Sequence, residues 1–168
     1  MSRSNIKYIL LFIVSVLSQT LVFDNIYFSS YINIFIYILF LLLLPIETNK
    51  FVVLGLSFIL GLSIDIFNST PGIHASATVL IGYLRPAILR LYAPREGYEP
   101  NKFPSIKNHG LNWFIKYSIS IILIHHIFLF FVDAYGFSHF FYTMGKILIS
   151  SVFSLIFIII GHLLIMKE

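Results

Sequence analysis

Hydrophobic positions divide the chain into six long apolar stretches with polar or proline-containing connections between them. The runs are continuous and lack the strict alternation of membrane β-strands, which indicates helices. Several are close to the lower limit for crossing a hydrocarbon core ~30 Å thick, which takes about 20 helical residues. The pattern predicts an all-α, polytopic membrane protein, a bundle of about six transmembrane helices in one domain, 1–168. The predicted spans are 8–23, 31–45, 51–67, 73–89, 114–132 and 143–166.

Composition supports a membrane protein over a soluble one. Hydrophobic residues make up 58% of the chain and charged residues only 11%, whereas soluble domains carry about a quarter charged residues. The chain has no cysteine, which excludes disulfides and thiolate chemistry. Its formal net charge of +4 does not indicate nucleic-acid binding, because the basic residues flank the apolar stretches.

The distribution of lysine and arginine predicts the orientation. With a cytoplasmic N-terminus and six spans, the inner side collects all but one of the 11 basic residues, as the positive-inside rule requires. The exception is Lys146. Both termini are then expected on the cytoplasmic side of the membrane. The predicted inner residues are Arg3, Lys7, Lys50, Arg85, Arg90, Arg95, Lys102, Lys107, Lys116 and Lys167.

One connection is long. Residues 91–112 contain Pro94, Pro100 and Pro104, a density that disfavours a stable helix. Its basic residues suit contact with anionic lipid headgroups or with a cytoplasmic partner. The other connections are short, so the second, third and fourth stretches are expected to be antiparallel neighbours.

Two rows of small and polar residues lie on the third and fourth stretches. Residues four apart share one helix face, and small residues let membrane helices approach closely. We therefore expect the two rows to face each other or to face a third helix together. The rows are Ser57, Gly61 and Asp65 on one stretch, and His74, Thr78 and Gly82 on the other, with Ala75 and Ser76 beside them.

Asp65 stands near the outer end of its stretch, where an acid costs less than at the bilayer centre. Pro71 and Gly72 follow and suit the start of the next helix, whose first N–H groups are unpaired and form a positive dipole end. We expect Asp65 to accept hydrogen bonds from these groups or from His74 and so to fix the hairpin. Partner binding and ion or proton handling are the alternatives for Asp65.

The remaining polar residues predict packing. His125 and His126 are adjacent, so they point about 100° apart on a helix and cannot both reach one metal. Each is expected to bond a neighbouring helix. Arg85 is expected to extend to the inner interface, and Ser150, Ser151, Ser154 and Gly161 are interpreted as a packing seam. No nucleophile, phosphate loop, metal or cofactor pattern stands out, so we expect neither an enzyme nor a cofactor.

The motif around the third and fourth stretches resembles a known family. Gly61-x-x-x-Asp65, Thr70-Pro71-Gly72, His74-Ala75 and Gly82-Tyr83 resemble the MreD family of rod shape-determining membrane proteins, with residue usage like that of Bacteroidetes. Length and number of apolar stretches agree over the whole chain. By this resemblance Asp65, Pro71, Gly72 and His74 are the matching positions.

The resemblance implies a non-enzymatic scaffold of the cell-elongation machinery, in the inner membrane of a bacterial cell. MreD-like proteins work with the single-span protein MreC, and through one complex with MreB, RodA and the elongation transpeptidase, in lateral peptidoglycan synthesis and rod shape. The alternative is a small transport module, such as the substrate-binding subunit of a vitamin-type transporter. That alternative needs an outward-facing pocket with converging polar groups, and the sequence offers few of these: Gln19, Asp65, His74 and Lys146.

Overall fold

The computed structural model describes residues 3–26, 29, 31–99, 102–137 and 139–165, and this part of the chain is helical without β-strands. Four of its helical segments are long and apolar enough to cross a membrane: Ile6–Asn25, Lys50–Asn68, Leu111–Asp133 and Phe140–Ile165. The helices are α1 (Arg3–Leu21), η1 (Phe23–Asn25), α2 (Ile38–Leu42), α3 (Lys50–Asn68), α4 (Ile73–Leu91), α5 (Ile106–His109), α6 (Leu111–Asp133) and α7 (Phe140–Ile165).

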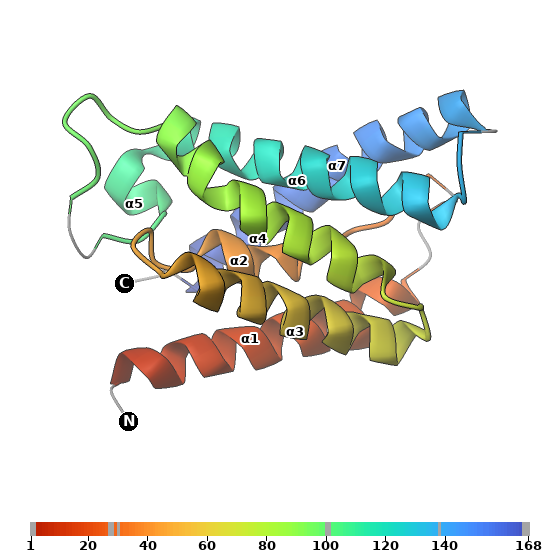
Figure 1. Ribbon diagram of the computed structural model, residues 1–168, viewed down its shortest axis with the longest axis horizontal. Coiled ribbons are helices and arrows are strands. Elements are labelled where there is room, and N and C mark those ends of the chain that lie inside the picture. The colour runs from red at the N-terminus through yellow and green to blue at the C-terminus, as the bar shows by residue number, and fades with distance from the viewer. Residues whose placement is uncertain (1–2, 27–28, 30, 100–101, 138, 166–168) are drawn as a thin grey trace.

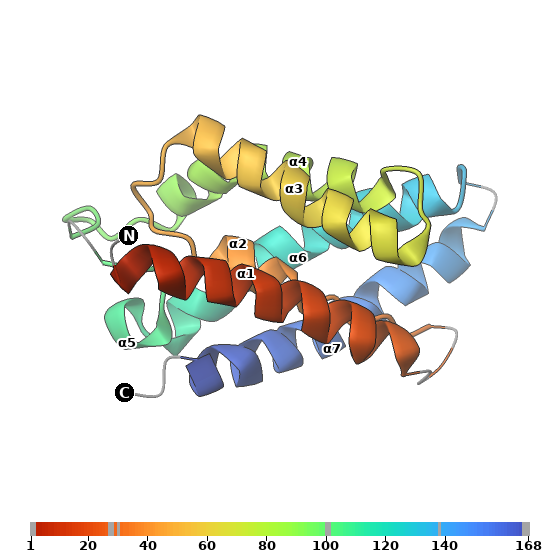
Figure 2. The same ribbon diagram turned by 90° about the horizontal axis from the view of Figure 1, so that it is seen from below.

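The long helices lie side by side: α1, α3 and α6 run in one direction, and α4 and α7 run in the opposite direction (Figure 1). One end of the bundle, which we call the turn end, carries the α3–α4 turn at residues 69–72 and the last turn of α6. The opposite end, the loop end, carries the long connection at 92–110. The first residues of α1 and the last residues of α7 both lie at the loop end (Figures 1 and 2).

The predicted stretches match α1, α3, α4, α6 and α7 to within a few residues. The predicted end of the last span, Met166, and the inner residue Lys167 lie outside the described residues. The long connection contains one short helix, α5, which the proline count did not predict. It starts after Pro104, where the Ser105 side chain accepts a hydrogen bond from the backbone N–H of Asn108 at 3.3 Å. A capped single turn is compatible with the prolines that precede it.

The second predicted span is different. Over 31–45 the only helix is α2, which has five residues, and the residues before it are not helical. Isoleucine recurs at every second position from 32 to 38, and this alternation of β-branched residues favours extended backbone. Pro45 then ends the helical part, because the residue before a proline avoids helical conformation. We call residues 31–44 the core segment.

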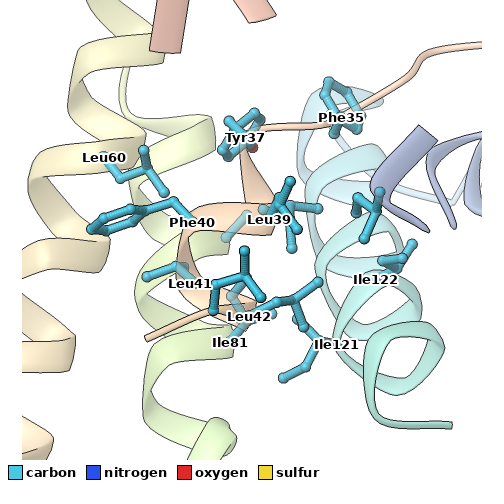
Figure 3. Packing of buried hydrophobic residues seen from close by; sticks show 14 of the residues in the cluster. Phe35, Tyr37, Leu39, Phe40, Leu41, Leu42, Leu60, Ile81, Ile121 and Ile122 are labelled. Atoms are coloured by element: carbon cyan, nitrogen blue, oxygen red, sulfur yellow. The ribbon is translucent and has the colours of Figure 1, made fainter. Parts of the chain in front are cut away.

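The core segment lies in the centre of the bundle. Every residue from Tyr37 to Leu44 is buried. Figure 3 shows α2 side chains such as Leu41 and Leu42 between Leu60 and Ile81 on one side and Ile121 and Ile122 on the other. These partners come from α3, α4 and α6, so the core segment fills the space that the long helices enclose.

The outward faces of the long helices are apolar. On α3, Phe51 and Ile66 are each 70% exposed and Phe67 is 58% exposed. Large exposed apolar side chains in this number are unusual on a soluble protein. Together with the length of the helices they indicate that the bundle lies in a membrane.

Candidate functional site

In the extended part of the core segment, backbone N–H and carbonyl groups lack the partners that a helix would provide. Side chains of α7 form hydrogen bonds with several of these groups. Ser150 Oγ accepts from the N–H of Asn33 at 3.0 Å and donates to the carbonyl of Tyr31 at 3.1 Å. Ser154 Oγ accepts from the N–H of Phe35 at 3.0 Å. An unpaired backbone group inside a membrane costs several kcal/mol. These serines therefore hold the chain in its extended path, beyond the packing role that sequence had assigned them.

Gln19 of α1 binds the same segment from another side. Its Oε1 accepts from the N–H of Ile36 at 2.8 Å and of Tyr37 at 3.4 Å. Its Nε2 donates to the carbonyl of Ile34 at 2.9 Å and to the Asp24 carboxylate at 2.6 Å. The side chain is fully buried, and it satisfies both donors and acceptors of a strand-like backbone.

Tyr37 joins two histidines inside the bundle. Its hydroxyl lies 3.0 Å from His74 Nδ1 and 2.7 Å from His125 Nε2. A tyrosine hydroxyl has one proton, so it donates to one ring and accepts from the other. This couples the tautomers of His74 and His125.

His126 points elsewhere, as its adjacent position in the helix requires. Its Nε2 lies 3.2 Å from Ser154 Oγ on α7. His125 bonds Tyr37, which precedes α2, and His126 bonds α7, so the expectation of a bond to a neighbouring helix is confirmed for His126 and is wrong for His125. Within the described residues no three histidine or acidic side chains are arranged to hold a metal ion.

Asp65 caps α4. Its Oδ1 accepts from the N–H of His74 at 3.0 Å and its Oδ2 from the N–H of Ala75 at 2.8 Å, while Thr70 Oγ1 also donates to the carboxylate. The helix needs this external cap because its own N-cap residue, Gly72, has no side chain that can bond it. The hydrogen bonds expected from the sequence are therefore present, and Asp65 is only 3% exposed.

The turn between α3 and α4 depends on backbone conformation as well. Gly72 has a φ of 82°, in the left-handed region that favours glycine, and the exposed Pro71 precedes it. The N–H of Thr70 bonds the carbonyl of Asp65 at 3.0 Å. The turn thus brings the Asp65 carboxylate back over the first turn of α4.

The two rows of small residues face each other. A Cβ added at Gly61 would lie 2.5 Å from the Cα of Ala75 and 2.2 Å from Thr78 Oγ1, and one added at Gly82 would lie 2.2 Å from Ser57 Oγ. Thr78 bonds back to the carbonyl of His74 at 2.8 Å. The glycines are what permit this contact between α3 and α4.

Arg85 is buried, so the prediction that it extends to the interface is wrong. It is 2% exposed. Its Nε donates to Tyr117 Oη at 2.9 Å, Nη2 donates to the carbonyl of Leu44, and Nη1 to that of Pro45 at 3.4 Å. The carbonyls that follow α2 have no helical partner. The guanidinium, a multiple donor, bonds both of them, and Thr48 also donates to that of Pro45.

The connection at the loop end folds against the bundle. Tyr98 Oη donates to the carbonyl of Leu89 at 2.6 Å, and Trp113 Nε1 donates to that of Tyr92 at 2.8 Å. The His109 and Trp113 ring centroids are 4.5 Å apart. Burial, and secondarily the charge of Lys102, lower the pKa of His109, while burial raises the pKa of Tyr98.

A cavity of about 410 Å³ lies at the turn end. Its wall contains more polar residues than the four that the sequence analysis named for an outward-facing pocket. Of the four candidates named from sequence, only His74 lines it, because Gln19 and Asp65 are bonded behind the wall and Lys146 lies beside it. The polar lining residues are Asp24, Asn25, Asn33, Asn68, Thr70, His74 and Asp133.

The predicted residues Asp65, Pro71, Gly72 and His74 thus lie in one continuous region, which the structure extends to Tyr37. Sequence reasoning missed Tyr37 and the role of Gln19, although a glutamine and an alternating Ile pattern inside apolar sequence were the available signals. Comparison with family models, with curated proteins and with solved structures finds no match to this chain.

Proposed function

We propose that the protein is a non-enzymatic membrane scaffold of the MreD kind, which binds a single-span partner of the MreC kind in the cell-elongation machinery. The observation that carries this proposal is the use of the buried polar atoms. Gln19, Asp65, Arg85 and Ser150 all bond the backbone of the protein itself. Such contacts give a rigid bundle with apolar outer faces, which suits a protein that holds other membrane helices in place.

The proposed topology has six passes, with the core segment as the second. A helix over residues 31–44 would rise about 21 Å, too short for a ~30 Å hydrocarbon core. With 32–35 extended at about 3.3 Å per residue the same residues can reach roughly 28 Å. The extended part therefore provides most of the length that a helix of these residues would lack.

Charge supports placing the loop end in the cytoplasm. Basic residues collect there, and Lys146 is near the turn end. Since the chain has no cysteine, single cysteines can report topology. A cysteine at Lys107 should be protected from an impermeant thiol reagent in intact cells, whereas one at Ser69 should react. The reverse result would contradict the orientation.

The scaffold role is tested in cells that produce the tagged protein at native level. An MreC-like single-span protein should co-purify, and depletion of the tagged protein should widen the cells. Asp65→Ala should reduce co-purification and widen the cells, since it loosens the hairpin that carries the family-like motif. Wild-type recovery of the partner and normal width in this variant would contradict the link between hairpin and partner.

The cavity at the turn end favours a second candidate, a solute-binding transport module. It has polar groups from several elements and a volume within the range of about 300–1,000 Å³ for small-molecule sites. This candidate predicts loss of solute uptake at normal cell width on deletion. The scaffold proposal predicts the opposite pair of results.

A further inference from the structure

The turn-end cavity carries an excess of negative charge. Two of its lining residues, Asp24 and Asp133, are exposed acids on different elements. Asp24 accepts from the amides of Gln19 at 2.6 Å and Asn68 at 3.0 Å, which are neutral donors. Across the described residues, no lysine, arginine or histidine forms an ion pair with either acid.

Lys146 is the basic residue beside the cavity, and it is engaged with one wall. Its Nζ lies 4.6 Å from the centroid of the Phe130 ring. With the Asn33 amide oriented to satisfy both of its neighbours, the side-chain oxygen accepts from Lys146 at 3.1 Å. One positive charge against two negative ones leaves the cavity net negative.

The inner wall combines an available polar atom with aromatic rings. His74 is only 6% exposed, and its Nδ1 is bonded to Tyr37. Its Nε2 has no hydrogen-bond partner in the part of the chain that the structure describes. Phe35 lies beside it at 5.6 Å between ring centroids, and Phe23 and Phe130 complete the aromatic lining.

We propose that this cavity binds the ammonium or guanidinium group of an organic cation. Carboxylates are the natural acceptors for such groups, and aromatic faces attract them. A bare metal ion suits the site less well, because the described histidines and acids offer no cluster of three ligands. The group can belong to a free small molecule or to a basic side chain of a partner, and this chemistry lies outside the scaffold proposal.

The test uses the purified full-length protein in lipid nanodiscs and isothermal titration. The probes are agmatine, a blocked pentapeptide with one central arginine, and butylurea as a neutral control. Agmatine or the peptide should bind with a Kd of about 1 mM or tighter, and butylurea at least about tenfold more weakly. Binding of agmatine alone identifies a free cation as the ligand, and binding of the peptide identifies a side chain.

Variants tie the binding to the cavity. Asp133→Asn and Asp24→Asn should each weaken binding about tenfold, and the thermal unfolding of Asp133→Asn should match wild type. Glu47→Gln removes an exposed acid between α2 and α3 and should leave the affinity unchanged. Absence of binding by both cations, equal binding of butylurea, or equal affinity in Asp133→Asn would overturn the proposal. The assay contains no partner protein, so its failure is separate from failure of the scaffold role.

Discussion

The α3–α4 hairpin and the core segment both contain backbone N–H groups without helical partners, and side chains bond these groups in two different ways. In the hairpin the polar groups are close in sequence, since Asp65 bonds N–H groups nine and ten residues away. In the core segment they are remote, since Ser150 bonds Asn33 across 117 residues. The hairpin is therefore specified locally, whereas the core segment keeps its extended form only inside the assembled bundle.

The comparison separates two kinds of stability. A local cap can form as soon as α3 and α4 have inserted beside each other. The N–H groups of Asn33 and Ile36 acquire their partners only when α7 and α1 are in place, because Ser150 and Gln19 come from those helices. We infer that the core segment is the last element to become fixed.

The largest effect is expected at Arg85, which fixes the end of the core segment. Arg85→Met removes three charge-assisted hydrogen bonds and takes the guanidinium donor from the carbonyl of Leu44, while the carbonyl of Pro45 keeps its hydrogen bonds from Thr48. Unfolding in mixed SDS micelles should show a loss of about 4 kcal/mol. Arg90→Met, at an exposed position on the same helix, is the control and should change little. Equal stability of the two variants would remove Arg85 from this role.

A smaller effect is expected at Gly61, in the hairpin. Gly61→Ala places a methyl group against the backbone of α4, where neither His74 nor Ala75 can yield easily. Overpacking of this kind costs up to about 3 kcal/mol. Gly55→Ala on the same helix meets no atom within 4 Å and should be neutral or slightly stabilising. A neutral Gly61→Ala would show that α3 and α4 are not in close contact.

The cap itself is expected to contribute less. Asp65→Ala leaves the N–H groups of His74 and Ala75 unpaired and should destabilise the protein by about 2 kcal/mol. Asp65→Asn keeps one acceptor and should lose about half as much. Asp133→Asn, an exposed acid at the same end, serves as the comparison. Stability of Asp65→Ala within the error of wild type would mean that another group caps α4.

The smallest effect concerns the loop end and pH. The pKa of His109 is lowered in the folded state, so its neutral form is the one that docks. Docking should be complete above about pH 6.5, the ordinary value, and should weaken as the pH falls below it. Trp113 is the single tryptophan of the chain, and its fluorescence should report the change. His109→Gln should abolish the pH dependence, and an unchanged pH profile in that variant would assign it to another group.

Sequence predicted the hairpin in detail because its contacts depend on helix periodicity, turn chemistry and a charge near a helix start. It predicted the second stretch as a helical span because hydrophobic content was read without regard to the alternation of Ile32, Ile34 and Ile36. The partners of that backbone lie on α1 and α7, and no local pattern links Gln19 or Ser154 to it. Arg85 was misplaced for the same reason, since its acceptors follow α2, about 40 residues away.

The turn-end cavity, like the core segment, depends on contacts between segments that are remote in the sequence. Its acids come from η1 and from the end of α6, two positions that the sequence placed in separate outer connections. Only the assembled bundle brings Asp24, Asp133 and His74 to one wall.

The most direct test of the account measures amide hydrogen exchange in the core segment. The central claim is that buried side chains hold the backbone of that segment, and Ser150 and Ser151 form a matched pair on α7. Ser150 bonds the N–H of Asn33, whereas the buried hydroxyl of Ser151 bonds nothing among the described residues. We predict that Ser150→Ala accelerates exchange of the Asn33 amide about tenfold, and that Ser151→Ala leaves it unchanged. Equal exchange of the Asn33 amide in wild type and in Ser150→Ala would contradict the claim.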